Sequence, residues 1–138
     1  MAKGTRIGAA VMFVQQLDRS ISFYRDVLGL HVADQSPTAA LLASPAGTEL
    51  ILRAMGSDAA HPLGAVGLQY VLWTAAGQED LDRCERVLKE RSAYRDTRGS
   101  DGVTVVEGHD PDDTVLMIVY PGPEERPLRK LPIRIYGW

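Results

Sequence analysis

Three histidines offer the widest range of chemistry in this chain, because imidazole serves as a general base and as a metal ligand near neutral pH. His31 follows the end of a predicted helix, His61 lies beside a proline, and His109 precedes an Asp-Pro-Asp sequence. No two of them have the i, i+4 spacing of a helix or the i, i+2 spacing of a strand that would direct both at one ion. We therefore interpret each as an exposed or turn-capping side chain.

Carboxylate and thiol groups are the next candidates for chemistry. Asp110, Asp112 and Asp113 form an acidic loop. The surrounding sequence lacks the other ligands of a twelve-residue calcium loop, so we predict a turn held by side-chain-to-backbone hydrogen bonds. Cys84 is the single cysteine, which excludes an intrachain disulfide, and its place on an apolar helical stripe favours inert packing over a nucleophilic role.

Several catalytic sequence patterns are absent from the chain. It contains no Gly-x-Ser-x-Gly elbow, no glycine-rich phosphate loop ending in Gly-Lys-Ser/Thr, and no Gly-x-Gly-x-x-Gly after a strand. Hydrolase, nucleoside-triphosphatase and dehydrogenase functions therefore lose support.

Length and composition describe the protein that must position these groups. With 138 residues, 45% of them hydrophobic and 24% charged, the chain is typical of one globular domain. A formal charge of −3 with scattered basic residues argues against nucleic acid as a partner. Its apolar runs are far shorter than the roughly 20 residues that a membrane helix needs, so we expect no membrane association. A cytoplasmic location is expected because there is one cysteine and no apolar segment typical of a secretory signal.

Hydrophobic periodicity predicts the order strand, helix, strand, strand, strand twice. In the first half, the helix has Asp18 as its N-cap and ends at Gly29, and the strands span residues 6–15, 30–35, 38–43 and 48–53. In the second half, the helix spans residues 79–91 and the strands span 66–73, 94–97, 103–107 and 114–120. The chain thus divides into module one (about 5–54), a connector (55–65), module two (about 66–122) and a C-terminal tail (123–138).

The two halves also share sequence. Leu17-Asp18-Arg19-Ser20 recurs 64 residues later as Leu81-Asp82-Arg83-Cys84. The last strands of the halves align with an offset of about 66 residues and the first strands with an offset of about 58. Because element order repeats together with the tripeptide Leu-Asp-Arg, we interpret the chain as a single domain built by internal duplication.

The segment Val11–Leu30, with its Leu-Asp-Arg-Ser, Phe-Tyr and Val-Leu-Gly-Leu pieces, resembles the opening strand and helix of the vicinal oxygen chelate superfamily. That superfamily includes glyoxalases, bleomycin-resistance proteins and extradiol dioxygenases. Asp110-Pro111-Asp112-Asp113-Thr114 is similar to the family's Asp-Pro-Asp-Gly-Asn turn, with Asp113 in place of the glycine. The resemblance covers residues 5–122 and implies an α+β fold in which two tandem β-α-β-β-β modules form an open, cup-shaped mixed sheet.

The resemblance also implies where a metal would be held, because metal-dependent members use His, Glu or Gln from the first and last strand of each module. The corresponding positions here are Ala9, Ile51, Met117 and, by the 58-residue offset, about Gly67. None of these side chains suits a hard divalent cation, so we predict that the usual metal is absent. The alternative is a displaced partial site for Fe, Mn, Zn or Ni formed by Glu49 and Gln69, each two residues from such a position.

The wall of the implied cup follows from strand alternation. Its predicted inward positions are Ala9, Val11, Phe13, Glu49, Ile51, Arg53, Gln69, Val71, Trp73, Val115, Met117 and Val119. We predict that Phe13 and Trp73 stack on a flat ligand, that Arg53 or Gln69 meets its polar group, and that Met117 contributes to the wall.

These features predict a protein that binds a small, aromatic or apolar organic molecule in its cup without a metal. One alternative is a metal-dependent extradiol dioxygenase or a glyoxalase-type lyase or isomerase with displaced ligands. Another is a structural dimer whose cup is filled by its own side chains. Apolar residues alternate at the end of the tail, from Ile133 to Trp138, which favours packing on the protein's own sheet or in a homodimer.

Overall fold

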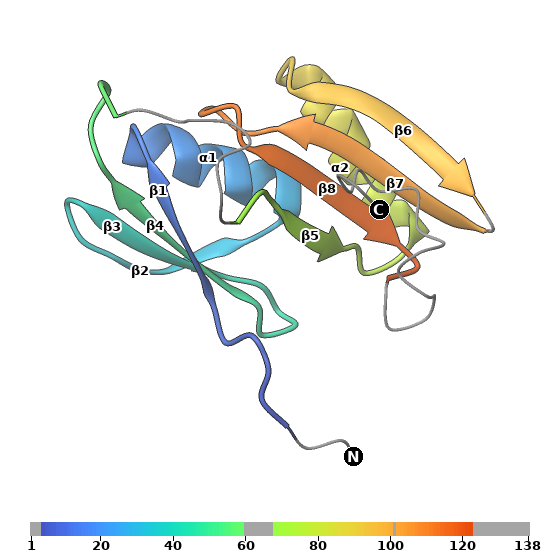
Figure 1. The fold of residues 1–138 in the computed structure, drawn as a ribbon, viewed down its shortest axis with the longest axis horizontal. Helices are drawn as coiled ribbons and strands as arrows, with labels where there is room; N and C mark the ends of the chain where they lie inside the picture. The colour runs from blue at the N-terminus through green and yellow to red at the C-terminus, as the bar shows by residue number, and fades with distance from the viewer. Residues whose placement is uncertain (1–3, 60–67, 101, 123–138) are drawn as a thin grey trace. The chain divides into compact units, whose positions relative to one another are not determined.

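The computed structural model describes residues 4–59, 68–100 and 102–122. The chain divides between residues 60 and 61 into two compact units, called here the first and the second unit. Within the described residues each unit has one helix and one four-stranded mixed sheet, and the element order confirms the predicted α+β class with two β-α-β-β-β modules (Figure 1). No helix in these ranges is long and apolar enough to cross a membrane.

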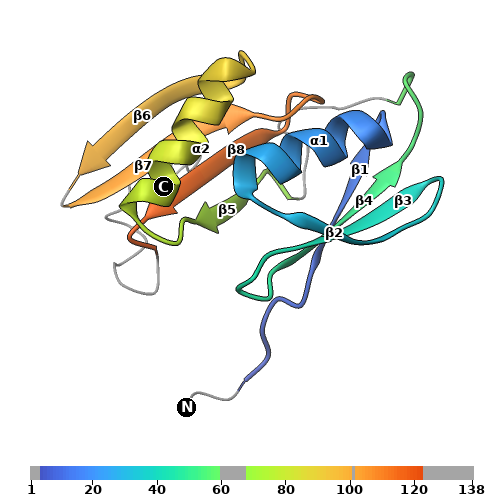
Figure 2. The ribbon, with the colours of Figure 1, turned by 180° about the vertical axis from the view of Figure 1, so that it is seen from behind.

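The first unit contains β1 (Ala10–Val14), α1 (Leu17–Leu28), β2 (His31–Gln35), β3 (Ala39–Ala43) and β4 (Glu49–Ala54). Its sheet has the order β1-β4-β3-β2, in which β1 runs parallel to β4 and the other pairs are antiparallel. Figure 2 shows α1 lying across one face of this sheet. That face carries Leu42, Leu50 and Leu52, which are fully buried, so the core of the first unit lies between α1 and the central strands.

Helix α1 ends where predicted, but its N-cap lies two residues earlier than predicted. Gly29 caps its C-terminus with φ 70°, a left-handed conformation that favours glycine, and its N–H donates to the Arg25 carbonyl at 3.0 Å. The N-cap is Gln16, so the prediction that Asp18 occupies that position is wrong. Asp18 instead lies in the first turn, where a carboxylate still interacts favourably with the helix dipole.

The second unit repeats this order with β5 (Val71–Thr74), α2 (Gln78–Glu90), β6 (Tyr94–Ser100), β7 (Val103–His109) and β8 (Val115–Tyr120). The sheet order is β5-β8-β7-β6, and α2 packs on one face through Leu81, Cys84 and Leu88. Gly108 on β7 permits a close approach, because a Cβ there would lie 2.6 Å from the Ala93 carbonyl oxygen and 3.0 Å from Leu88. Only a residue without a side chain fits that position.

The strand ladders give the alignment of the two repeats. Ile51 pairs with Val11 in the first unit, and the equivalent Met117 pairs with Leu72 in the second. The first strands are therefore 61 residues apart, and the predicted offset of about 58 is wrong. The sequence alone does not determine this offset, because it is defined by which residues of β5 pair with β8. Most of the predicted connector and all of the tail, residues 123–138, lie outside the described ranges.

The acidic turn before β8 has the predicted structure. The Asp110 carboxylate is buried and its Oδ1 accepts hydrogen bonds from the backbone N–H groups of Asp112 at 2.8 Å and Thr114 at 2.9 Å. Asp113, which stands where the resembling family has glycine, has φ 65°. The substitution thus leaves the left-handed turn in place, and aspartate is one of the few residue types that tolerate it.

Candidate functional site

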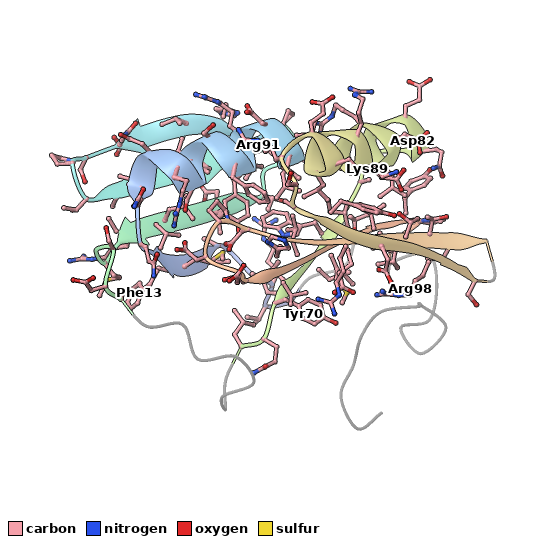
Figure 3. All side chains as sticks on the ribbon, turned by 90° about the horizontal axis from the view of Figure 1, so that it is seen from above. Phe13, Tyr70, Asp82, Lys89, Arg91 and Arg98 are labelled. Atoms are coloured by element: carbon pink, nitrogen blue, oxygen red, sulfur yellow. The ribbon has the colours of Figure 1, made fainter. Side chains whose placement is uncertain are left out.

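An exposed apolar sheet face is the first candidate site, and it lies in the first unit. Val11 pairs with Ile51 and Phe13 pairs with Arg53, so these four side chains share one face. Met12 points to the other face, where its Sδ accepts a hydrogen bond from the Tyr24 hydroxyl of α1 at 3.8 Å. The face with Phe13 is therefore the one that α1 leaves uncovered, as Figure 3 shows.

The exposure of this face is high for apolar groups. Val11 is 58% exposed and Phe13 is 67% exposed. Large apolar side chains that lie next to one another on a surface are typical of binding sites. Phe13 offers an aromatic ring for stacking, and the exposed side chain of Arg53 on the adjacent strand offers a charged group.

A shallow hollow of about 210 Å³ lies on the surface of the same unit, next to β2 and β3. Leu41 and Ile51 form its apolar wall, and Asp34, Gln35 and Ser36 line its polar rim. Because Ile51 pairs with both Val11 and Leu41, the hollow and the Phe13 face lie on neighbouring strands of one sheet. The first unit thus combines an apolar platform with polar groups at its border.

The predicted site residues of the second unit are distributed differently from the prediction. Leu72 pairs with Met117, whereas Trp73 pairs with Ile118 and Val71 with Leu116. Trp73 and Val71 therefore lie on the sheet face opposite Met117, and the prediction that the three share a face is wrong. The alternation of side chains was predicted correctly within each strand. The pairing between β5 and β8 is shifted by one residue from the prediction, so that Leu72 and not Trp73 or Val71 shares the face of Met117. Gln69 lies before the first residue of β5, and its role in binding stays a prediction.

The face that carries Met117 is buried, in contrast to its counterpart in the first unit. Val103, Val105, Met117 and Val119 form a cluster whose members are at most 1% exposed, and Tyr70, Leu72 and Val115 pack against it. Tyr70 is also a polar side chain that sequence reasoning missed. The 61-residue offset makes it the equivalent of Ala9, and Figure 3 shows its ring on the side of the second sheet away from α2.

The corrected alignment changes one of the four positions at which family members hold a metal. Ala9, Ile51 and Met117 remain, and Tyr70 replaces Gly67, which lies outside the described residues. A methyl group, an alkyl chain, a thioether and one phenol form a poor donor set for a hard divalent cation, so these residues do not fit the family's metal. Of the alternative pair, Glu49 starts β4 in the first unit and Gln69 precedes β5 in the second. Among the described residues, no group of three or more His, Cys, Asp or Glu side chains is arranged to hold an ion.

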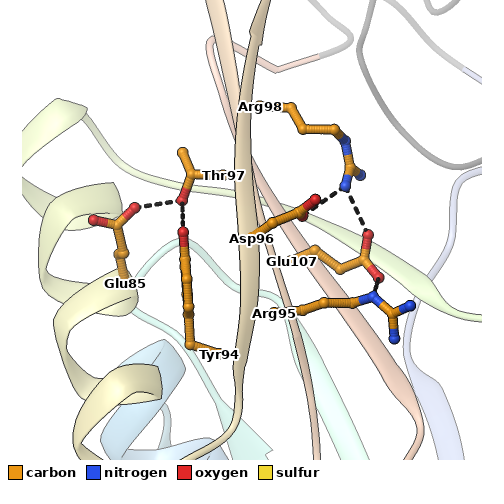
Figure 4. Close-up of polar contacts among 7 residues, drawn as sticks. All are labelled: Glu85, Tyr94, Arg95, Asp96, Thr97, Arg98 and Glu107. Atoms are coloured by element: carbon orange, nitrogen blue, oxygen red, sulfur yellow. Dashed lines mark hydrogen bonds and ion pairs between the residues drawn. The ribbon is translucent and has the colours of Figure 1, made fainter.

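A buried charge cluster in the second unit is the main feature that sequence reasoning did not predict. Glu107 on β7 is 0% exposed and pairs with Met117, so its carboxylate lies on the sheet face away from α2. Arg98 Nη1 approaches Glu107 Oε1 at 3.0 Å, and Arg95 Nε approaches Oε2 at 3.4 Å (Figure 4). Arg98 Nη1 also contacts Asp96 Oδ1 at 2.6 Å. A glutamate that directly follows Val105 and Val106 in the strand was the available signal, since a buried carboxylate requires partners.

A β-bulge brings Arg95 to this cluster. Tyr94 pairs with Gly108 and Asp96 with Glu107, which leaves Arg95 as the extra residue of β6. Tyr94 and Thr97 bond to each other on the α2 side, where Thr97 donates to Glu85. Figure 4 shows these residues on one side of β6 and Arg95 with Glu107 on the other. Without the bulge, regular alternation would place Arg95 on the opposite face from Asp96.

The first unit carries the same bulge in the equivalent place. There Val32 pairs with Leu42 and Asp34 with Leu41, leaving Ala33 as the extra residue. Leu41 is thus the counterpart of Glu107, since each lies opposite an aspartate on one side and opposite Ile51 or Met117 on the other. Where the first unit has a hollow, the second unit has an ion-pair cluster.

The comparisons with known proteins agree with this architecture. The sequence profile of the Glyoxalase/Bleomycin resistance protein/Dioxygenase superfamily matches residues 6–118. A search of curated proteins finds no match. Among solved structures, a glyoxylase/bleomycin resistance protein/dioxygenase domain from Frankia sp. EAN1pec is similar with a TM-score of 0.72 and 19% identity over 86% of this chain and 98% of that chain.

Two further structures carry more specific names. Lactoylglutathione lyase from Agrobacterium tumefaciens aligns with a TM-score of 0.63 and 20% identity, covering 86% of this chain and 95% of that chain. The fosfomycin resistance protein FosX from Mesorhizobium loti aligns with a TM-score of 0.67 and 13% identity, covering 91% and 98%. At these identities the likeness shows a shared fold and leaves the chemistry to the residues of each site.

Proposed function

Because the chain belongs to the glyoxalase/bleomycin resistance protein/dioxygenase superfamily, we propose that it binds a small, aromatic or apolar organic molecule on the Phe13 face without a divalent metal. The observation that carries this proposal is the pairing of Phe13, 67% exposed, with Arg53 on the neighbouring strand. A flat ligand stacked on the ring would bury apolar surface and present an acidic or carbonyl group to the guanidinium.

The size of the Phe13 contribution follows from the area that its ring can bury. Covering a large apolar side chain contributes about 1.5–3 kcal/mol, which corresponds to a factor of roughly 10 to 100 in the dissociation constant. Val11 and Ile51 extend the same surface, and the hollow next to Leu41 gives a ligand an apolar recess. Such a site can sequester a ligand by complementarity alone.

The proposal that no metal takes part rests on the donor set. Ala9, Ile51, Tyr70 and Met117 stand where relatives have imidazole or carboxylate ligands, and they do not fit a hard cation. The second candidate function is a metal-dependent lyase, isomerase or dioxygenase. It is favoured only by the exposed Glu49 carboxylate, two residues from Ile51 on the same face of β4.

Fluorescence titration with N-phenyl-1-naphthylamine, a neutral aromatic probe, tests the binding function. We expect saturable binding to the full chain that weakens at least tenfold in Phe13→Ser and stays within twofold of wild type in Met55→Ser. Met55 is a matched control because it is also exposed, at 49%, and lies outside the ladder that forms the Phe13 face. Equal binding by both variants would contradict the proposal.

Metal analysis of the same purified protein distinguishes the second candidate. We expect substoichiometric Fe, Mn, Zn and Ni, and unchanged probe affinity after dialysis against EDTA. A stoichiometric metal that is lost in Glu49→Gln would favour the enzyme instead. A second copy of the chain is the other way to cover Phe13, and sedimentation analysis of wild type and Phe13→Ser would reveal it as a dimer that only the wild type forms.

A further inference from the structure

The buried carboxylate of Glu107 orients two guanidinium groups in the second unit. An ionised carboxylate without contact to water is strongly destabilised unless positive groups and hydrogen bonds compensate it. Arg98 supplies one partner through Nη1 at 3.0 Å, and Arg95 supplies the other through Nε at 3.4 Å. The two arginines are therefore held by a group that cannot move into solvent.

Arg95 uses only one edge of its guanidinium in this contact. Its side chain is 61% exposed, and within the described residues Glu107 is its one ion-pair partner. Figure 4 shows the two terminal nitrogens of Arg95 directed away from Glu107. Two parallel N–H donors on one planar edge match the two oxygens of a carboxylate.

The bulge at Arg95 makes this orientation a structural feature of the strand. The register shift between Tyr94 and Asp96 places Arg95 on the same face as Glu107, and the Glu107 contact then restrains an otherwise flexible side chain. Restraining a binding group before the ligand arrives lowers the entropic cost of binding. The first unit has the same bulge with Ala33 in the equivalent place, so the buried acid behind Arg95 is what distinguishes it from an arginine with only a surface role.

We propose that Arg95, positioned by Glu107, binds the carboxylate of a small organic anion. The charges of the cluster favour a monoanion. Among the described residues, Arg95 and Arg98 are balanced by Asp96 and Glu107, so one bound carboxylate leaves the cluster with an excess negative charge and a second carboxylate group would add to that excess. This site lies in the second unit, and its proposal stands independently of the Phe13 face in the first.

Nuclear magnetic resonance of the full chain labelled with ¹⁵N tests the site directly. Sodium benzoate is the probe, and benzamide is its neutral isostere at the same concentration. We expect the Arg95 Nε–Hε resonance to shift saturably with benzoate and to stay in place with benzamide or with sodium chloride at equal ionic strength. A shift that benzamide or chloride reproduces would overturn the proposal.

Two matched variants assign the effect to Arg95. Arg95→Gln should weaken benzoate binding at least tenfold, whereas Arg86→Gln should change it less than twofold. Arg86 is a suitable control because its side chain is 65% exposed and pairs with Glu90 on the surface of α2. Wild-type affinity in Arg95→Gln would refute the assignment.

A conservative variant tests the paired geometry separately from the charge. Arg95→Lys keeps the positive charge but replaces the planar edge by a point charge. We expect wild type to bind benzoate more tightly than inorganic phosphate, and Arg95→Lys to lose that preference. Tighter binding of phosphate to wild type would reject the carboxylate class. In each variant Arg98 still faces Glu107 Oε1 at 3.0 Å, and a circular dichroism spectrum that matches the wild type verifies that the fold is kept.

Discussion

Glu107 and Leu41 occupy equivalent positions in the two repeats, yet Glu107 is a buried carboxylate held by two arginines and Leu41 lines a hollow. Each lies on the third strand of its module, opposite an aspartate that follows a bulge. The duplicated backbone has thus been kept while the side chains at one place have diverged. The first repeat has an apolar recess at this position, and the second has a guanidinium group held by a buried carboxylate.

This equivalence predicts a non-additive effect on stability. Glu107→Leu alone should destabilise the chain by about 2 kcal/mol, because it leaves two partly covered guanidinium groups without their partner. The triple change Glu107→Leu, Arg95→Ala and Arg98→Ser installs the residue types of Leu41, Ala33 and Ser36. It should recover at least about 1 kcal/mol of that loss. Urea denaturation of the wild type and both variants measures the difference, and a triple variant that is no more stable than Glu107→Leu would contradict the interpretation.

Gly108 predicts a steric effect that can be isolated with a control glycine. In Gly108→Ala the new Cβ would lie 2.6 Å from the Ala93 carbonyl oxygen, a backbone atom that cannot move away easily. We expect a loss of about 1–3 kcal/mol in the free energy of unfolding. Gly99→Ala on the neighbouring strand has its nearest atom at 3.7 Å and should change stability by less than about 0.5 kcal/mol. Similar thermal midpoints for the two variants would show that the contact at Ala93 can relax.

Asp113 tests whether the left-handed turn constrains the choice of residue. Its φ of 65° penalises any side chain with a Cβ, and the penalty is smaller for aspartate than for alanine. We expect Asp113→Gly to be more stable than Asp113→Ala by about 1 kcal/mol in chemical denaturation. A more stable alanine variant would mean that the turn changes its conformation when the residue is replaced.

Cys84 should be unreactive in the native protein. Burial raises the pKa of its thiol from 9.0 to about 11, with Asp80 adding to the effect and Arg83 opposing it. The thiolate that attacks disulfide reagents is therefore scarce at pH 8. We expect slow reaction with 5,5′-dithiobis(2-nitrobenzoic acid) in native buffer and rapid reaction of one thiol in urea. Rapid native labelling would show that α2 opens readily.

The same thiol sets the sign of a pH effect on stability. Its pKa is raised in the folded state, so the protonated thiol is favoured there and the stabilisation is fully present below pH 9.0. It is lost progressively as pH rises toward about 11. Cys84→Ala, which cannot ionise, should therefore show a smaller decrease in unfolding free energy between pH 9 and pH 11 than wild type. An equal decrease would assign the alkaline loss to other groups.

The sequence by itself determined the element order, the duplication and the helix end at Gly29, because each depends on local periodicity or on the conformation of one residue. The turn at Asp110 was predictable for the same reason, since its donors lie within four residues of the carboxylate. Phe13 and Arg53 were also assigned to one face correctly, because Phe13 of β1 pairs directly with Arg53 of β4.

Only the tertiary structure decided which residues of different strands meet. The 61-residue offset of β5 depends on how β5 pairs with β8 in the parallel ladder. This offset moves Trp73 away from the Met117 face and puts Tyr70 in the place assigned to Gly67. The Glu107 cluster depends on a bulge that lets Arg95 reach a carboxylate 12 residues away in the chain. Register and bulges are set by pairing between strands, so a reading along one strand contains no signal for them.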